Sequence, residues 1–158
     1  MDSAIRELIN VEAPKYGVDP QFLYSIVMAE SSGRVWVSKV EFHYPYLVTP
    51  EIYARKLGIS KSTEVINQRT SYGLVQIMGG VAREQGWESH LPRIYLPKVN
   101  VTLGLRLIKK LMKKYDGNMD KVAAAYNWGH AAINRETGKY MNQEYVDKIN
   151  KYYKGGAQ

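Results

Sequence analysis

A glutamate lies on the apolar side of a predicted helix near the start of the chain. Asp19 is a typical N-cap residue and Pro20 a typical first residue, so the sequence predicts that a helix begins there. Four residues share one face of it: Leu23, Ile26, Val27 and Glu30. A carboxylate on an apolar face is costly unless it is paired or protonated. Glu30 is therefore either a buried glutamate with an arginine or backbone partner, or an acid kept protonated and ready to donate its proton.

Two further segments carry polar side chains among apolar ones. After Glu30-Ser31-Ser32-Gly33 come Ser-Tyr-Gly-Leu-Val-Gln-Ile-Met at 71–78 and Ala-Ala-Tyr-Asn-Trp-Gly at 124–129. These three segments, in this order, resemble the soluble lytic transglycosylase family, whose pattern is Glu-Ser, then Gly-Leu-Met-Gln, then Ala-Tyr-Asn-x-Gly. Goose-type lysozymes share much of it. The resemblance extends from about Asp19 to Tyr153, with a Tyr-Val-x-x-Ile stretch at 145–149, and it implies an all-α, lysozyme-like fold.

The resemblance also implies roles for individual residues. Glu30 corresponds to the catalytic acid and base. Five residues correspond to substrate-binding positions: Ser31, Ser71, Gln76, Tyr126 and Asn127. Among them, Gln76 would line the sugar site and the Tyr126 hydroxyl would contact the glutamate. Taken singly, Tyr126 is more simply a core aromatic with a satisfied hydroxyl, and Gln76 a loop-to-helix cap.

The implied reaction is cleavage of peptidoglycan glycan strands at the β-1,4 bond between N-acetylmuramic acid and N-acetylglucosamine, leaving 1,6-anhydromuramic ends. The first alternative is hydrolysis, as in a goose-type muramidase, which needs a second carboxylate or a positioned water. Glu41, Glu51 and Glu64 are the candidates for that carboxylate, although they are more simply interpreted as solvated charges. A catalytically inactive glycan-binding module is a third possibility, against which the intact Glu30 argues.

The elements that must position these residues are almost all helical. We expect helices over 3–16, from Asp19 onward, from Pro50 to Gly58, over 97–115, over 118–129 and from about Asn142. Val35, Val37 and the aromatics that follow give 34–48 some strand character, so a short hairpin or an extended loop is expected there. We predict a single catalytic domain over 1–158, with an insert at about 34–70 and a frayed tail, Gly155–Gln158.

The formal net charge of +7 and the pI of about 9.5 favour a polyanionic partner. Four lysines form the densest basic run: Lys109, Lys110, Lys113 and Lys114. We interpret this run as the solvated face of a helix. A basic nucleic-acid-binding domain is a distant alternative, because the sequence shows no specific helix-turn-helix signal. We therefore expect peptidoglycan, and no nucleic acid, as the partner.

The sequence shows no pattern typical of a metal site or a cofactor site. The chain has no cysteine, and its three histidines, His43, His90 and His130, lack metal-ligand spacing, so we expect no metal and no cofactor. The first thirty residues have no apolar stretch of signal-peptide type, and no window suits a membrane-spanning helix. We expect a monomer that acts on the bacterial cell wall. Residues 71–87 resemble phage-type family members, which favours an endolysin held in the cytoplasm until release.

Overall fold

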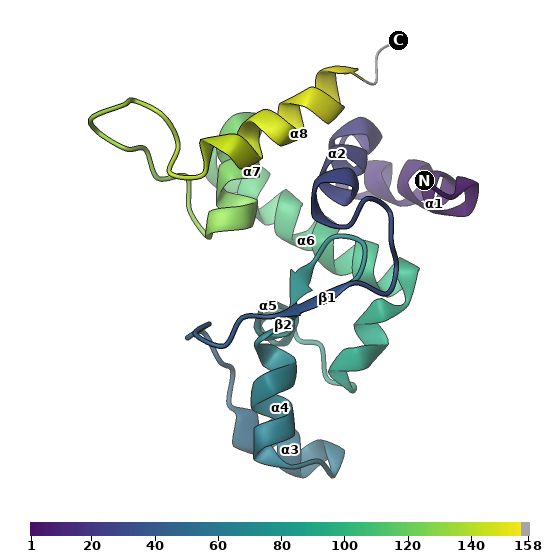
Figure 1. Ribbon diagram of the computed structural model, residues 1–158. Coiled ribbons are helices and arrows are strands. Elements are labelled where there is room, and N and C mark those ends of the chain that lie inside the picture. Colours follow the sequence, from purple (N-terminus) through teal and green to yellow (C-terminus); the bar gives the residue numbers. More distant parts are fainter. Residues whose placement is uncertain (156–158) are drawn as a thin grey trace. The chain divides into compact units, whose positions relative to one another are not determined.

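The computed structural model describes residues 1–155 and is mostly helical (Figure 1). Its chain forms two compact units, which are described separately below. Unit 1 comprises Met1–Gly33 with Gly104–Gln158, and unit 2 comprises Arg34–Leu103. Helix α6 (Pro97–Lys114) contributes residues to both. None of the described helices is long and apolar enough to cross a membrane.

Unit 1 is built from helices, with the bounds expected from their capping residues. Besides its part of α6, it contains α1 (Ser3–Glu12), the 3₁₀ helix η1 (Ala13–Tyr16), α2 (Pro20–Glu30), α7 (Met119–Trp128) and α8 (Gln143–Gly155). The Asp19 side chain accepts a hydrogen bond from the Gln21 amide at 2.8 Å, and Asn118 caps α7 in the same way. Gly17 ends η1 in the left-handed conformation that favours glycine. These helix predictions are confirmed.

The core of unit 1 forms where α8 packs against α2 and α7. Ile26 and Val27 of α2 are fully buried, as are Val146 and Ile149 of α8. Burial of these side chains supplies most of the favourable free energy of packing. Because the two helices share this core, the last turn of α2 lies against the first turns of α8, as the hydrogen bonds described below show.

Unit 2 holds a small sheet and several short elements. They are β1 (Ser38–Val40), α3 (Pro50–Leu57), α4 (Lys61–Gln68), β2 (Thr70–Tyr72), β3 (Ile77–Met78), α5 (Gly79–Glu84) and the 3₁₀ helix η2 (Leu91–Tyr95). The three strands are antiparallel in the order β1-β2-β3, with Ser38 opposite Tyr72 and Ser71 opposite Met78. The extended segment expected at 34–48 is present, but its strand pairs with β2 rather than within 34–48. Sequence patterns did not reveal α4, α5 and η2, which are too short for a clear helical period.

A buried ion pair joins α4 to α5 within unit 2. Both side chains of the pair, Glu64 on α4 and Arg83 on α5, are fully buried. The guanidinium donates to both carboxylate oxygens, at 2.8 and 3.0 Å, and Gln68 donates to the same carboxylate at 2.9 Å. Arg83 also lies over the Tyr53 ring, 4.0 Å from its centroid. The interpretation of Glu64 as a solvated charge is therefore wrong. The pairing could not be predicted from the sequence, because Arg83 lies on a different helix from Glu64.

The helices and strands do not test two predictions, one about the extent of the domain and one about the C-terminal tail. The single catalytic domain over 1–158, with an insert at about 34–70, stays a prediction. Of the tail expected to fray, Gly155 is the last residue of α8, and 156–158 lie outside the described residues.

Candidate active site

Glu30 is the last residue of α2, at the point where the chain leaves the helix. The next residue, Ser31, ends the helix: its hydroxyl donates to the Val27 carbonyl at 3.1 Å and accepts from the Gly33 amide at 3.2 Å. Ser32 and Gly33 both have positive φ angles, 55° and 79°, which turn the chain away. Ser31 is buried, and its two hydrogen bonds give it a structural part in ending the helix that carries Glu30. Its substrate-binding role stays a prediction.

A tyrosine from α8 holds the Glu30 carboxylate. The Tyr145 hydroxyl donates to Glu30 Oε1 with an oxygen–oxygen distance of 2.5 Å. One turn later, Lys148 donates to the Ala29 carbonyl at 2.6 Å, which brings a positive charge close to the carboxylate. Both contacts depend on the packing of α2 against α8. The carboxylate thus has one oxygen engaged by a neutral donor and a cation near it.

Opposing effects act on the acidity of Glu30. Burial raises the pKa, because the low-dielectric surroundings disfavour the charged form, whereas the Tyr145 hydrogen bond and the Lys148 charge lower it. Burial is the largest effect, so the pKa of Glu30 stays above its ordinary value. Such a group can be protonated when a reaction begins and ionised later in the same turnover.

Tyr126 on α7 also belongs to the surroundings of Glu30. Burial raises its pKa well above the ordinary value, and the nearby Glu30 charge adds to the effect. The same two causes, burial and then Glu30, raise the pKa of Tyr145. Both phenols therefore remain neutral hydrogen-bond donors over the physiological pH range. The contact of the Tyr126 hydroxyl with Glu30 stays a prediction. Sequence reasoning did not assign the contact that Tyr145 makes, although the Tyr-Val-x-x-Ile stretch includes that position.

Asn127 follows Tyr126 at the end of α7 and is exposed. Its side-chain oxygen accepts a hydrogen bond from Asn142 at 2.9 Å, and the same Asn142 amide group donates to the Ala124 carbonyl at 3.1 Å. Asn142 precedes α8, so it ties the end of α7 to the start of the helix that carries Tyr145. Unit 1 therefore contains four of the expected residues: Glu30, Ser31, Tyr126 and Asn127.

The other two expected residues, Ser71 and Gln76, belong to unit 2. The Gly-Leu-Val-Gln segment forms the turn between β2 and β3. Gln76 has a positive φ of 47°, and its side-chain amide donates to the Gly73 carbonyl at 2.9 Å and to the Val37 carbonyl at 3.0 Å. The Ser71 hydroxyl donates to the Gln76 side-chain oxygen at 2.8 Å. Hence Gln76 fixes its own turn, and its role in lining a sugar site stays a prediction.

Asn100 on α6 secures this turn, and sequence reasoning missed it. Its fully buried amide donates to the Tyr72 carbonyl at 2.7 Å and accepts from the Val75 amide at 2.9 Å. A side-chain carbon at Gly73 would lie 2.7 Å from the Asn100 amide nitrogen, and Gly73 has a φ of +69°. Position 73 therefore requires glycine for space as well as for backbone conformation. Nothing in the spacing of the motif points to Asn100.

Comparison with known families agrees with the three motifs. The family described as transglycosylase SLT domain matches residues 7–149, which is most of the chain. The chain belongs to this family. As an SLT domain it has the lysozyme-like helical fold and is a lytic transglycosylase domain, which binds and degrades peptidoglycan. The match favours peptidoglycan over the nucleic-acid alternative.

The acids considered for a second carboxylate of this SLT domain all have cationic partners. Glu41 pairs with Lys39 at 2.7 Å, and Glu51 pairs with Lys61. Hydrogen bonding and the charge of Lys61 lower the pKa of Glu51. Glu64 is enclosed with Arg83, as described above. Among the described residues there is no group of three or more His, Cys, Asp or Glu side chains that could hold a metal ion.

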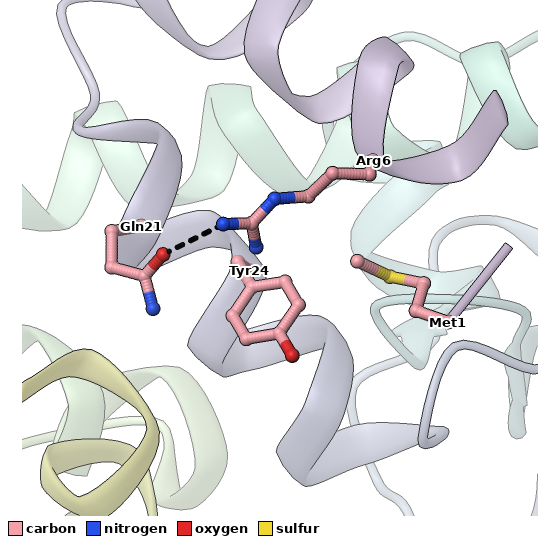
Figure 2. A pocket seen from close by; sticks show the side chains of 4 residues that line it. All are labelled: Met1, Arg6, Gln21 and Tyr24. Atoms are coloured by element: carbon pink, nitrogen blue, oxygen red, sulfur yellow. Dashed lines mark hydrogen bonds between the residues drawn. The ribbon is translucent and has the colours of Figure 1, made fainter. Parts of the chain in front are cut away.

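Unit 1 of the SLT domain also contains a cavity (Figure 2). It has a volume of about 240 Å³ and is lined by Met1, Arg6, Gln21 and Tyr24, from α1, α2 and the chain start. The Arg6 guanidinium donates to Gln21 at 3.2 Å and lies 4.1 Å from the centroid of the Tyr24 ring. Arg6 is thus occupied in joining α1 to α2, and none of the residues expected to carry chemistry lines the cavity.

Proposed function

We propose that this SLT domain cleaves the β-1,4 bond between N-acetylmuramic acid and N-acetylglucosamine and leaves 1,6-anhydromuramic ends, with Glu30 as the general acid and base. One observation carries the proposal: a half-buried carboxyl with a raised pKa is held by a neutral tyrosine at 2.5 Å. That arrangement suits a single group that gives a proton and then takes one back. Family membership supplies the substrate class.

In the first step, protonated Glu30 acts as the acid. Because Tyr145 donates to Oε1, the proton resides on Oε2 and is transferred from there to the oxygen that links the two sugars. The bond between that oxygen and C1 of the muramic sugar breaks, and N-acetylglucosamine leaves with a free 4-hydroxyl. The carboxylate that remains is stabilised by the Tyr145 hydrogen bond and the Lys148 charge.

In the second step, ionised Glu30 acts as the base. It takes the proton of the muramic C6 hydroxyl while that oxygen bonds to C1, which closes the 1,6-anhydro ring. The nucleophile is part of the reacting sugar, so no water enters and no second carboxylate is needed. Glu30 is again protonated at the end, ready for the next bond.

The hydrolytic alternative needs a carboxylate that can attack the sugar or activate water. Of the three acids considered, Glu64 is fully buried with Arg83, and Glu41 and Glu51 are engaged by lysines. The groups that shift the pKa of Glu30 are a tyrosine and a lysine. These surroundings support the anhydro route over hydrolysis.

Digestion of purified cell wall in heavy-oxygen water, followed by mass spectrometry, tests the proposal. We expect muramic termini that carry the anhydro ring and no heavy oxygen, and no products from Glu30→Gln, which keeps the size of the side chain but cannot supply the proton. Reducing muramic ends that carry the heavy oxygen would establish hydrolysis instead. Single substitutions of Glu41 and Glu51 by glutamine would then identify the second acid.

A further inference from the structure

Trp36 is the most exposed large apolar side chain of the described residues. It exposes 76% of its surface and lies just before β1 in unit 2. Isolated exposed apolar residues are common, so exposure by itself indicates nothing. Trp36 differs from an isolated residue because its ring packs against another aromatic ring, that of Tyr95.

Three aromatic rings follow one another from the surface into unit 2. The centroid of Trp36 lies 5.3 Å from that of Tyr95 with the rings tilted by 42°, and Tyr95 meets Tyr72 edge-on at 5.2 Å. Tyr72 is buried, and its hydroxyl donates to the Asn67 carbonyl at 3.1 Å. Tyr95 therefore supports Trp36 from the protein side, while most of the indole surface remains accessible to solvent. Such support lowers the entropy cost of using the ring for binding.

The backbone beside Trp36 is joined to the Gly73–Gln76 turn. The carbonyl of the next residue, Val37, accepts hydrogen bonds from the Gly73 amide at 2.8 Å and from the Gln76 side-chain amide at 3.0 Å. The Gln76 side chain is thus engaged in fixing the backbone next to Trp36 within unit 2. An exposed flat apolar ring matches a sugar, which has an apolar C–H face on which such a ring can stack.

We propose that Trp36 is a stacking platform for a sugar ring of the glycan strand, in the part of unit 2 whose backbone is joined to the Gly73–Gln76 turn. The inference rests on the proposed function, because that function makes a peptidoglycan glycan the occupant. The platform contributes affinity and takes no part in proton transfer. Substitution of Trp36 therefore raises KM and leaves kcat nearly unchanged.

Binding without turnover gives the direct test. The parent protein is Glu30→Gln, and the probe is peptide-free glycan strands prepared from cell wall, with binding measured by sedimentation. Adding Trp36→Ala weakens binding about tenfold, the size of one lost aromatic contact, whereas Trp36→Phe recovers most of the affinity. Phe42→Ala is the matched control. Phe42 exposes 69% of its surface in the same unit, and its removal changes affinity by less than about twofold.

Several results would overturn the proposal. The first is a Trp36→Ala variant that binds the strands as tightly as the parent and has an unchanged melting temperature. The second is an equal loss of affinity in Phe42→Ala. The third is a parent protein that does not bind the strands at all. If Trp36→Ala lowers the melting temperature, Trp36→Leu, which keeps an apolar side chain but has no aromatic face, decides the question by the KM against kcat comparison in the active protein. Binding is independent of the bond that is cut, so heavy-oxygen labelling can refute the anhydro route while the platform stands.

Discussion

Burial and polar contacts shift the pKa of Glu30 in opposite directions. Burial raises its pKa, and Tyr145 and Lys148 moderate that rise by stabilising the ionised form. Without these contacts the pKa of Glu30 would be higher, so its ionised form would be a stronger base and its protonated form a weaker acid. With them, both forms are accessible during one turnover, which the proposed two-step reaction requires. The hydroxyl at position 145 is therefore the most informative single group to remove.

We expect Tyr145→Phe to lower kcat about tenfold, since a hydrogen bond to a charged group contributes about 1.5–3 kcal/mol. We also expect it to move the alkaline limb of the pH–rate profile to higher pH. The sign follows from the Tyr145 bond, which lowers the pKa of Glu30: without it that pKa rises, and the acid form persists to higher pH. Tyr153→Phe is the matched control, because it removes a hydroxyl of the same helix that donates to Asp19, and it should leave the limb in place. A larger shift in Tyr126→Phe would instead assign the main contact to Tyr126, as the family resemblance implied.

At the scale of elements, the turn between β2 and β3 shows how a motif depends on a partner outside it. The turn carries Gln76, but Asn100 on α6 fixes it through two buried hydrogen bonds. Gly73 allows this because it adopts a positive φ and leaves space for the Asn100 amide. The glycine of the motif is thus a structural requirement of the turn.

Gly73→Ala should destabilise the protein more than Gly86→Ala, as measured by chemical denaturation. Both glycines have positive φ angles, +69° and +80°, but a side-chain carbon at Gly86 would meet nothing within 4 Å. Gly86→Ala therefore carries only the backbone cost of about 1–2 kcal/mol. Gly73→Ala also displaces Asn100, which adds about 1 kcal/mol or more for each buried hydrogen bond that it breaks. Equal losses for the two variants would show that Asn100 does not secure the turn.

At the scale of the whole molecule, the net charge of +7 has a consequence for binding. The four lysines of the basic run on α6 are all exposed, which confirms that the run is a solvated helix face. Arg106 extends it and is also exposed. Their charges act over a distance, so they favour an anionic wall without selecting a particular bond.

We expect binding of the Glu30→Gln protein to intact, anionic cell wall to weaken as salt concentration rises, because salt screens exposed charges. Sedimentation with insoluble wall over a series of sodium chloride concentrations measures this. Peptide-free glycan strands, whose only anionic groups are the muramic carboxylates, serve as the control and should show a weaker dependence. Salt-independent binding to intact wall would assign the affinity to sugar contacts alone.

The sequence by itself determined the helices with strong caps and a clear apolar period, and it marked Glu30 through its place on an apolar stripe. These are local properties, readable from residues three or four positions apart. Only the tertiary structure decided that Tyr145 holds Glu30, that Asn100 secures the Gly73–Gln76 turn and that Glu64 is buried with Arg83. Each of these contacts joins residues far apart along the chain, and their meeting depends on how the helices pack rather than on local spacing.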